Sequence, residues 1–308
     1  MSDMKITSAD LNVQSAKRSQ RIAKIIRLII TYTFLSIMAL IVIFPFYWMI
    51  ISSLKTVEEY RFNVPTLWPQ TLDFANYSEA FSTANLWQLF KNTMFVGVVS
   101  TILSLVVTVL SAFAFARLQF KGKNVVFGLL MATMMVPGEL YTITNYLTVT
   151  GNLPFAKESL FDLRNTFIVL IVPMLVSVFY IYLLRQTFMQ IPNELYLAAK
   201  VDGTSDFKYL WKVMLPLSVS TVITITILKM MGAWNAYIWP KLVTFANDPS
   251  HQLITNGLRN AFKIDENGMA DYPVQMAAVA LVSIPLFLVF VFLRKYIMRG
   301  VSRSGIKG

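Results

Sequence analysis

The sequence predicts an all-α integral membrane protein with six transmembrane helices and both termini in the cytoplasm. Of the 308 residues, 56% are hydrophobic and only 14% are charged, whereas about a quarter of the residues of a soluble domain are charged. The apolar residues also gather in long runs, and a helix needs about 20 consecutive apolar residues to cross a bilayer core. Lys and Arg residues fall mainly on one side of the predicted spans, which sets their orientation.

Six apolar runs are long enough to cross the membrane. They cover Leu28–Ile51, Thr93–Phe115, Val125–Val149, Thr166–Leu184, Leu217–Trp239 and Val274–Leu293. The third run is interrupted by the stretch "VPGEL" at Val136–Leu140, where we expect the helix to break because Pro removes a backbone donor. The first run is too long for the core of a signal peptide and has no small-residue cleavage pattern after it, so we expect a retained anchor.

The positive charges indicate which loops face the cytoplasm. Most of the 27 Lys and Arg residues lie at the N-terminus, in the loops after the second and fourth spans, and at the C-terminus. We therefore divide the chain into a basic cytoplasmic segment (1–27), a six-span domain (28–293) with a cytoplasmic loop at 185–216, and a cytoplasmic tail (294–308). The net charge of +11 follows from this asymmetry and gives no reason to expect nucleic-acid binding.

The cytoplasmic loop contains a charged helix-turn-helix between two apolar spans, "NELYLAAKVDGTSDFKYLWKVMLPL" at 193–217. Asp202-Gly203 supplies the turn, because Gly accepts a positive φ at a helix end. Thr204 or Ser205 can cap the second helix, and Asp206 favours its first turn. The second helix then carries an apolar stripe at a spacing of three and four residues, formed by Phe207, Leu210, Trp211 and Met214.

Two interpretations of this hairpin follow from its pattern. It can lie on the lipid headgroups as an interfacial helix. It can also be a docking element for another protein, because Ala198 and Ala199 permit close approach and Trp211 offers an aromatic anchor.

The hairpin resembles the signature loop of binding-protein-dependent ABC importer permeases. That loop reads EAA, three residues, Gly, nine residues, Ile-x-Leu-Pro, and this chain has "AAKVDG", nine residues and "VMLP". Gly203 matches the Gly, Val213 stands for the Ile, and Leu215-Pro216 match the Leu-Pro. The Glu of the family falls on Leu197, although Glu194 lies about one helical turn earlier.

Other segments are similar to the sugar-importing branch of that family, among them "AFARLQFKGK", "MMVPGE" and "GAWNAYIWP". The tail "YIMRGVSRSGIKG" resembles the G-subunit of maltose-type importers, whose C-terminus reaches into the ATPase dimer. The resemblance implies the permease subunit of an ATP-driven importer in a bacterial cytoplasmic membrane, for a carbohydrate and most simply an oligosaccharide. It also implies three partners, namely a dimer of ATP-binding subunits, a second and non-identical permease, and an extracytoplasmic solute-binding protein.

The resemblance assigns two groups of residues to contacts with the ATPase. The docking residues are Glu194, Leu197, Ala198, Ala199, Asp202, Gly203, Phe207 and Trp211. The tail contact involves Gly300, Ser304 and Gly308.

The chain carries no set of residues for catalysis of its own. It has no G-x-x-x-x-G-K-[ST] phosphate-binding loop, so ATP and Mg are expected on the partner subunit and no cofactor on this chain. It has no Cys, and its single His251 has no second His with which to hold a metal.

Four residues are candidates for the translocation path. Lys229 lies near the centre of the fifth span, where a charge needs water or a partner, so it either pairs with a neighbouring helix or lines the path. Glu139 sits at the Pro137-Gly138 break, at the outer interface or in a cavity, and is the candidate partner for Lys229. Trp234 and Asn235 can bind a sugar by stacking and hydrogen bonds, although an aromatic ring in a helix more often simply packs.

The competing interpretation is an ion-coupled secondary transporter. Such a protein normally shows inverted repeats and several intramembrane acids. The sequence has no evident repeat, and Glu139 is the one acid within a predicted span.

Overall fold

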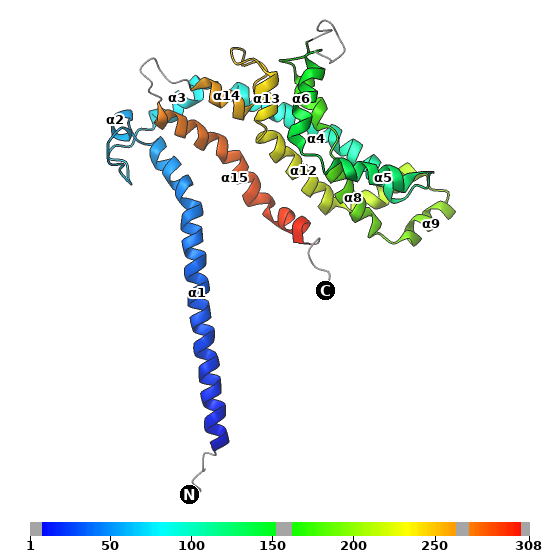
Figure 1. The fold of residues 1–308 in the computed structure, drawn as a ribbon, viewed down its shortest axis with the longest axis horizontal. Helices are drawn as coiled ribbons and strands as arrows, with labels where there is room; N and C mark the ends of the chain where they lie inside the picture. The colour runs from blue at the N-terminus through cyan, green and yellow to red at the C-terminus, as the bar shows by residue number, and fades with distance from the viewer. Residues whose placement is uncertain (1–7, 152–161, 263–270, 303–308) are drawn as a thin grey trace.

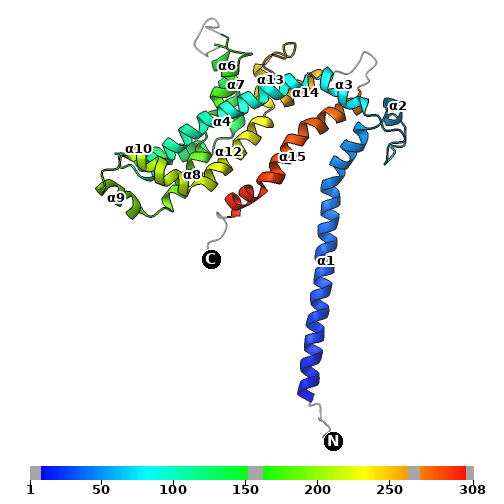
Figure 2. The same cartoon turned by 180° about the vertical axis from the view of Figure 1, so that it is seen from behind.

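The structure is a computed structural model that describes residues 8–151, 162–262 and 271–302 (Figure 1). Within these ranges every regular element is helical, which confirms the predicted all-α class. The helices form an elongated body from which the first helix stands apart (Figures 1 and 2).

Helix α1 (Ser8–Ser53) leaves the body at one end and runs away from it for most of its length. It meets α15 (Tyr272–Ser302) near the short helix α2 (Val57–Tyr60). Apolar side chains such as Leu40, which is 68% exposed, cover its free length. An apolar surface of this kind is suited to lipid or to another transmembrane helix.

Helix α4 (Leu86–Ala116) is the centre of the body. It packs against α8 (Val178–Met189), α12 (Val219–Trp234) and α14 (Ile254–Ala261). Its buried positions include many small residues, which let neighbouring backbones approach closely where there is no water to drive association. These small buried residues are Gly97, Ser100, Thr101, Ser104, Thr108 and Ala112.

Three single helices in the described residues are long and apolar enough to cross a membrane. They are Gln20–Ser53 within α1, Leu86–Ala116 (α4), and Tyr272–Arg294 within α15. Two bent pairs also pass that test together, Phe167–Met174 with Val178–Met189 and Asp206–Leu217 with Val219–Trp234. Length and composition therefore support three spans, or five if each bent pair is one span.

The third predicted span consists of two short helices, α5 (Lys123–Thr133) and α6 (Gly138–Val149). The chain between them includes Pro137, the N-cap of α6, whose φ of −56° and ψ of 135° are not helical. The interruption expected at "VPGEL" is thus confirmed, and neither half is long enough to cross a bilayer alone.

The fourth predicted span is broken too, which the sequence pattern did not predict. The short helices α7 (Phe167–Ile171) and η1 (Val172–Met174) end before α8 begins at Val178, and the two parts meet at 44°. Pro173 lies in the last helical turn before this break and was the available signal.

The fifth predicted span differs from the observed helix at both of its ends. The bend at Ser218 between α11 (Leu215–Leu217) and α12 is 81°, and α12 ends at Trp234, five residues before the expected boundary. Trp239 belongs instead to α13 (Ile238–Val243), and its Nε1 donates to the Val169 carbonyl at 2.9 Å.

The apolar core consists of several clusters, two of which lie at opposite ends of the body. One cluster, at the cytoplasmic end predicted from the sequence, includes Leu184, Phe188, Tyr209, Leu210 and Met214. At the opposite end, α3 (Ala75–Thr83) and α14 join α4 around a second group that comprises Ala84, Leu86, Leu89, Trp234 and Ile254.

Candidate functional site: a helical hairpin and a cavity at Lys229

The predicted hairpin is present as two helices joined by a tight turn. Helix α9 (Asn193–Val201) follows Pro192, and α10 (Asp206–Tyr209) continues into the π-helical turn η2 (Leu210–Met214). Gly203 has φ of +69°, and the Thr204 N–H donates to the Ala199 carbonyl at 2.8 Å. The Ser205 hydroxyl accepts from the Lys208 N–H, so Ser205 is the cap of the second helix.

The apolar stripe of the second helix is divided between two surroundings. Leu210 and Met214 are buried in the cytoplasmic core cluster. Phe207 and Trp211 are 63% and 55% exposed, and their ring centroids lie 6.0 Å apart. The first pair holds the hairpin on the body, whereas the second pair remains on the surface.

On α9 the exposed face carries most of the residues assigned to docking. Leu197 is 56% exposed, and Ala199 is half-buried against the cytoplasmic core. The remaining predicted docking residues are all exposed: Glu194, Ala198, Asp202 and Gly203.

An ion pair ties the two helices of the hairpin together. Lys200 Nζ lies 2.7 Å from Asp206 Oδ1, and the Tyr196 hydroxyl donates to the same oxygen at 2.7 Å. The hydrogen bond with Asp206 raises the pKa of the Lys200 ammonium. The ring of Tyr196 packs on that of Tyr209 at 5.2 Å, so the polar link sits directly above a buried aromatic anchor.

Two arginines fix the base of the hairpin, a role that sequence reasoning missed because it counted them only as cytoplasmic charges. Arg117, 8% exposed at the end of α4, donates to the carbonyls of Phe188 and Ile191 at 2.9 and 2.6 Å. Arg185 on α8 donates to the Phe115 carbonyl at 3.1 Å. These bonds join the end of α4 to α8 and to the chain that leads into α9, so the base of the hairpin is attached to both α4 and α8.

Lys229 lines an open cavity of about 290 Å³ at the break before α8. Its ammonium donates to the Met174 carbonyl and lies 5.9 Å from the centroid of the Tyr180 ring. The other lining residues are Ser100, Val176, Ser177, Leu228, Gly232 and Ala233. The bond to Met174 supports a structural role for Lys229, and its place in the cavity lining supports a role in the translocation path.

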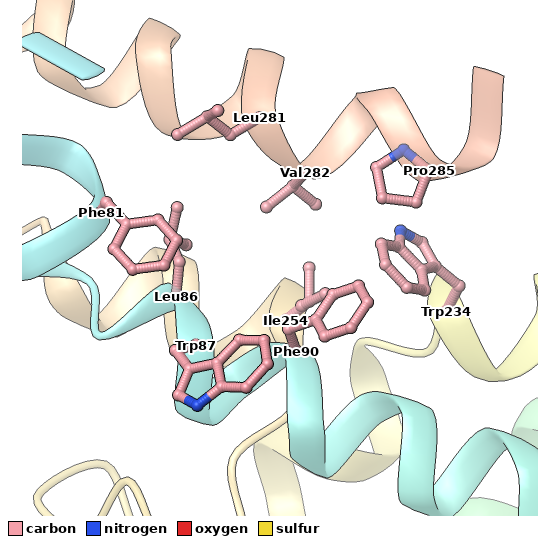
Figure 3. Close-up of a pocket in the computed structure, with 9 residues that line it drawn as sticks. All are labelled: Phe81, Leu86, Trp87, Phe90, Trp234, Ile254, Leu281, Val282 and Pro285. Carbon is pink, nitrogen blue, oxygen red and sulfur yellow. The ribbon is translucent and has the colours of Figure 1, made fainter. Parts of the chain in front are cut away.

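Trp234 lines a different cavity, of about 220 Å³, among apolar side chains of α3, α4, α14 and α15 (Figure 3). Its ring is 6% exposed and meets Phe90 edge-on at 5.8 Å. Asn235 caps the end of α12, is exposed, and donates to the Met231 carbonyl. The setting of Trp234 favours packing over sugar stacking.

The remaining predicted residues are placed only in part. Glu139 follows the first residue of α6, and Gly300 lies in the last turn of α15. Ser304 and Gly308 lie outside the described residues. His251 packs edge-on against Phe167 at 4.6 Å, and the described residues contain no cluster of metal ligands.

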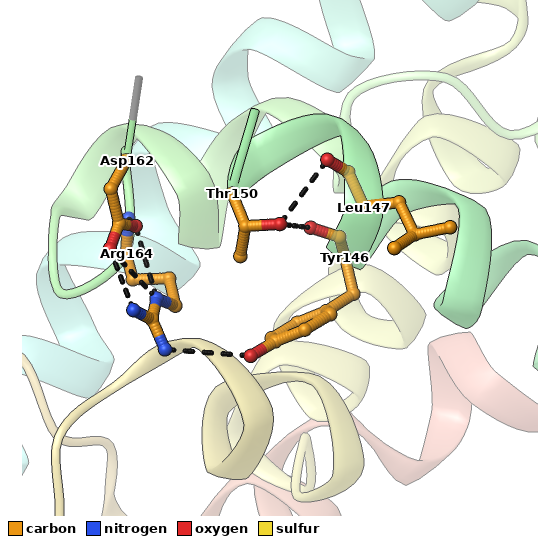
Figure 4. A network of polar contacts seen from close by, with 5 residues as sticks. All are labelled: Tyr146, Leu147, Thr150, Asp162 and Arg164. Carbon is orange, nitrogen blue, oxygen red and sulfur yellow. Dashed lines mark hydrogen bonds and ion pairs between the residues drawn. The ribbon is translucent and has the colours of Figure 1, made fainter. Parts of the chain in front are cut away.

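Polar contacts away from the hairpin hold loops that the sequence pattern did not link. The Asn92 amide donates to three carbonyls, those of Pro249, Ser250 and Gln252. Figure 4 shows Arg164 between the Asp162 carboxylate, at 2.7 Å, and the Tyr146 hydroxyl, at 3.4 Å. These bonds fix the loop before α14 on α4 and link the chain before α7 to α6.

Comparisons with known proteins agree on one family. A family model described as "Binding-protein-dependent transport system inner membrane component" matches residues 107–303. The arabinooligosaccharide transport permease AraQ of Halalkalibacterium halodurans is 28% identical over 273 residues, covering 88% of this chain and 93% of that protein. The sn-glycerol-3-phosphate permease UgpE of Rhizobium meliloti is 30% identical over 284 residues, covering 90% and 96%.

A solved structure shares the fold. The crystal structure of a bacterial ABC transporter that imports the acidic polysaccharide alginate contains a chain that matches with a TM-score of 0.76. The match covers 91% of this chain and 98% of that chain, at 23% identity.

Proposed function

Because the chain belongs to the family of binding-protein-dependent transport system inner membrane components, we propose that it is the permease subunit of an ATP-driven carbohydrate importer. The proposed arrangement is six spans with both termini in the cytoplasm of a bacterium, and the hairpin between spans four and five facing inward. The relatives include permeases for arabinooligosaccharides and for sn-glycerol-3-phosphate, which supports an oligosaccharide or a related compound as cargo.

The observation that carries the proposal is the contrast between the two faces of the hairpin. Leu210 and Met214 anchor it in the core, while Leu197, Phe207 and Trp211 are left exposed. Exposed aromatic residues beside a fixed base are typical of an anchor for a protein partner. We propose that this partner is an ATPase dimer, which binds ATP and Mg, while this chain binds no cofactor.

The mechanism follows from how the hairpin is attached. Closure of the ATPase dimer draws this hairpin toward that of a second, non-identical permease. Arg117 and Arg185, bonded across α4 and α8, transmit that movement to the spans. An extracytoplasmic binding protein delivers the sugar at the outer surface, where Asn92 holds the loop before α14.

The docking surface can be tested by co-purification. Phe207→Ser combined with Trp211→Ser should abolish recovery of the ATPase subunit with this chain and abolish ATP-dependent uptake. A matched control replaces Phe62 and Trp68, which are 46% and 69% exposed near α2, and should leave both unchanged. Retention of the ATPase by the first double variant contradicts the docking proposal.

The energy source separates the proposal from an ion-coupled transporter. Uptake in intact cells should fail when ATP is depleted and persist when a proton ionophore is added under conditions that preserve ATP. The reverse result favours ion coupling.

The tail is proposed to reach between the ATPase subunits, by its resemblance to the maltose-type G-subunit. Deleting residues 301–308 should leave assembly intact but allow ATP turnover without substrate. Normal coupling in the truncated complex argues against any role of the tail in the ATPase.

A further inference from the structure

The cavity at Lys229 contains a positive charge with no carboxylate partner among the described side chains. Lys229 is the eleventh residue of α12, and neither ion pair in the described part of the chain involves it. The Met174 carbonyl takes one of the three ammonium donors. A charge at this depth is costly unless further partners reach it, so the geometry leaves room for an anion.

A second positive feature borders the same cavity, namely the N-terminus of α8. The 12-residue helix begins at Val178 directly after the break, and the Ser177 hydroxyl makes no capping hydrogen bond. The N–H groups of a first helical turn have no acceptors within the helix and carry partial positive charge that attracts anions. Val176, Ser177 and Tyr180 from this helix start line the cavity together with Lys229.

The rest of the lining suits a sugar ring. Tyr180 offers an aromatic face and a hydroxyl, and the Ser177 hydroxyl lies at the helix start. Aromatic faces pack on the C–H surface of sugars while hydroxyls bond to their oxygens. On α12 the small residues Gly232 and Ala233 line the cavity beside Leu228 and Lys229.

From these observations, and on the basis of the proposed function, we infer that the cavity recognises anionic saccharides. The Lys229 ammonium and the α8 N-terminus hold the negative group, and Tyr180 contacts the ring beside it. The group is a carboxylate of a uronic acid residue or a phosphate ester, which share a negative charge and several acceptor oxygens.

The test uses the complete complex of both permeases, the ATPase and the binding protein in proteoliposomes. Three probes separate the sources of charge: trigalacturonate, its methyl-esterified neutral form, and galactose 1-phosphate. The wild-type complex should import at least one anionic probe. Lys229→Met should reduce uptake of that probe about tenfold more than uptake of a neutral sugar, since hydrogen bonds to charged groups are the stronger ones.

Two further variants protect the test against a folding defect. Ser177→Asp places a carboxylate in the cavity but keeps a favoured helix cap, so it should cause the same selective loss with an unchanged melting temperature. Lys241→Met removes an exposed charge from α13 and should leave the ratio of anionic to neutral uptake unchanged.

The outcomes distinguish this inference from the proposed function. Import of neutral sugars alone, or an equal effect of Lys229→Met on both kinds of probe, overturns the anionic cavity and leaves Lys229 as a structural link to Met174. Absence of ATP-dependent uptake of any saccharide contradicts the proposed function itself.

Discussion

Replacing Gly203 separates two costs that usually occur together, backbone strain and steric exclusion of a partner. Its φ of +69° lies in the left-handed region, which costs an L-residue about 1–2 kcal/mol, or a factor of roughly 5–30 in the population of the turn. A Cβ at this position meets no atom of the described chain within 4 Å. Gly203→Ala and Gly203→Leu should therefore destabilise the isolated chain equally, whereas Gly203→Asn should be milder because Asn tolerates this region.

The complex should respond differently from the isolated chain. If an ATPase subunit packs closely on the turn, Gly203→Leu should abolish docking and uptake while the protein still inserts in the membrane, and Gly203→Ala should reduce them only modestly. Thermal unfolding of the purified chain measures the strain, and co-purification with uptake measures the docking. Equal uptake by the Ala and Leu variants, or a Leu variant that retains both ATPase and transport, refutes close packing at Gly203.

Three further predictions follow from other contacts. Leu197→Glu, which places the family's acid on an exposed site, should be tolerated; complete loss of assembly in co-purification means that the ATPase offers an apolar socket. Arg117→Met removes both bonds to the carbonyls of Phe188 and Ile191 and should destabilise the chain by about 3 kcal/mol, as measured by thermal unfolding. Arg117→Lys should be intermediate. If the Met variant is destabilised no more than the Lys variant, the geometry of the guanidinium bonds is unimportant there. Hydrogen bonds from Ser250 and Asn165 lower the pKa of Asp248, so its stabilising effect is present above the unfolded pKa of about 3.9 and is lost as pH falls through the lower folded value. The difference in melting temperature between wild type and Asp248→Ala should thus shrink only below about pH 4, and a constant difference from pH 3 to 7 contradicts it.

The sequence was informative where a local rule decides the structure. Gly203 marks a turn that needs a positive φ, Ser205 caps a helix with its own hydroxyl, and Pro137 interrupts a span. Each of these depends on a few neighbouring residues, so the pattern predicts it, although the choice between Thr204 and Ser205 as the helix cap required the structure. The resemblance of the hairpin to the family motif is what leads from these local features to the expected ATPase contact.

The sequence was uninformative where contacts between distant segments decide the outcome. Phe207, Leu210, Trp211 and Met214 share one stripe by spacing, yet packing on α8 and the π-helical turn bury only two of them. Similarly, Arg117 resembles any cytoplasmic charge until the carbonyls near Phe188 are brought to it by the fold. Periodicity reveals neither which stripe residues are buried nor what Arg117 bonds to. The first depends on the tertiary core, and the second on carbonyls about 70 positions away.

The bent spans raised a related difficulty. Hydropathy measures only the length of an apolar run, and Leu217–Trp239 remains apolar through a bend of 81° at Ser218. The break before α8 is hidden in the same way, and with it the position of Lys229 beside a free helix start.

The guanidinium bonds at the base of the hairpin have a mechanical consequence. A docking loop joined to its domain by single bonds behaves as a tether and absorbs displacement in its own dihedral angles. Here Arg117 joins α4 to the chain directly before Pro192, and Arg185 on α8 bonds back to α4. Tyr209, at the end of α10, is buried in the core. We therefore expect the hairpin to move together with α4 and α8 when α9 is displaced, and we expect bending to concentrate at the breaks at 175–177 and at Ser218.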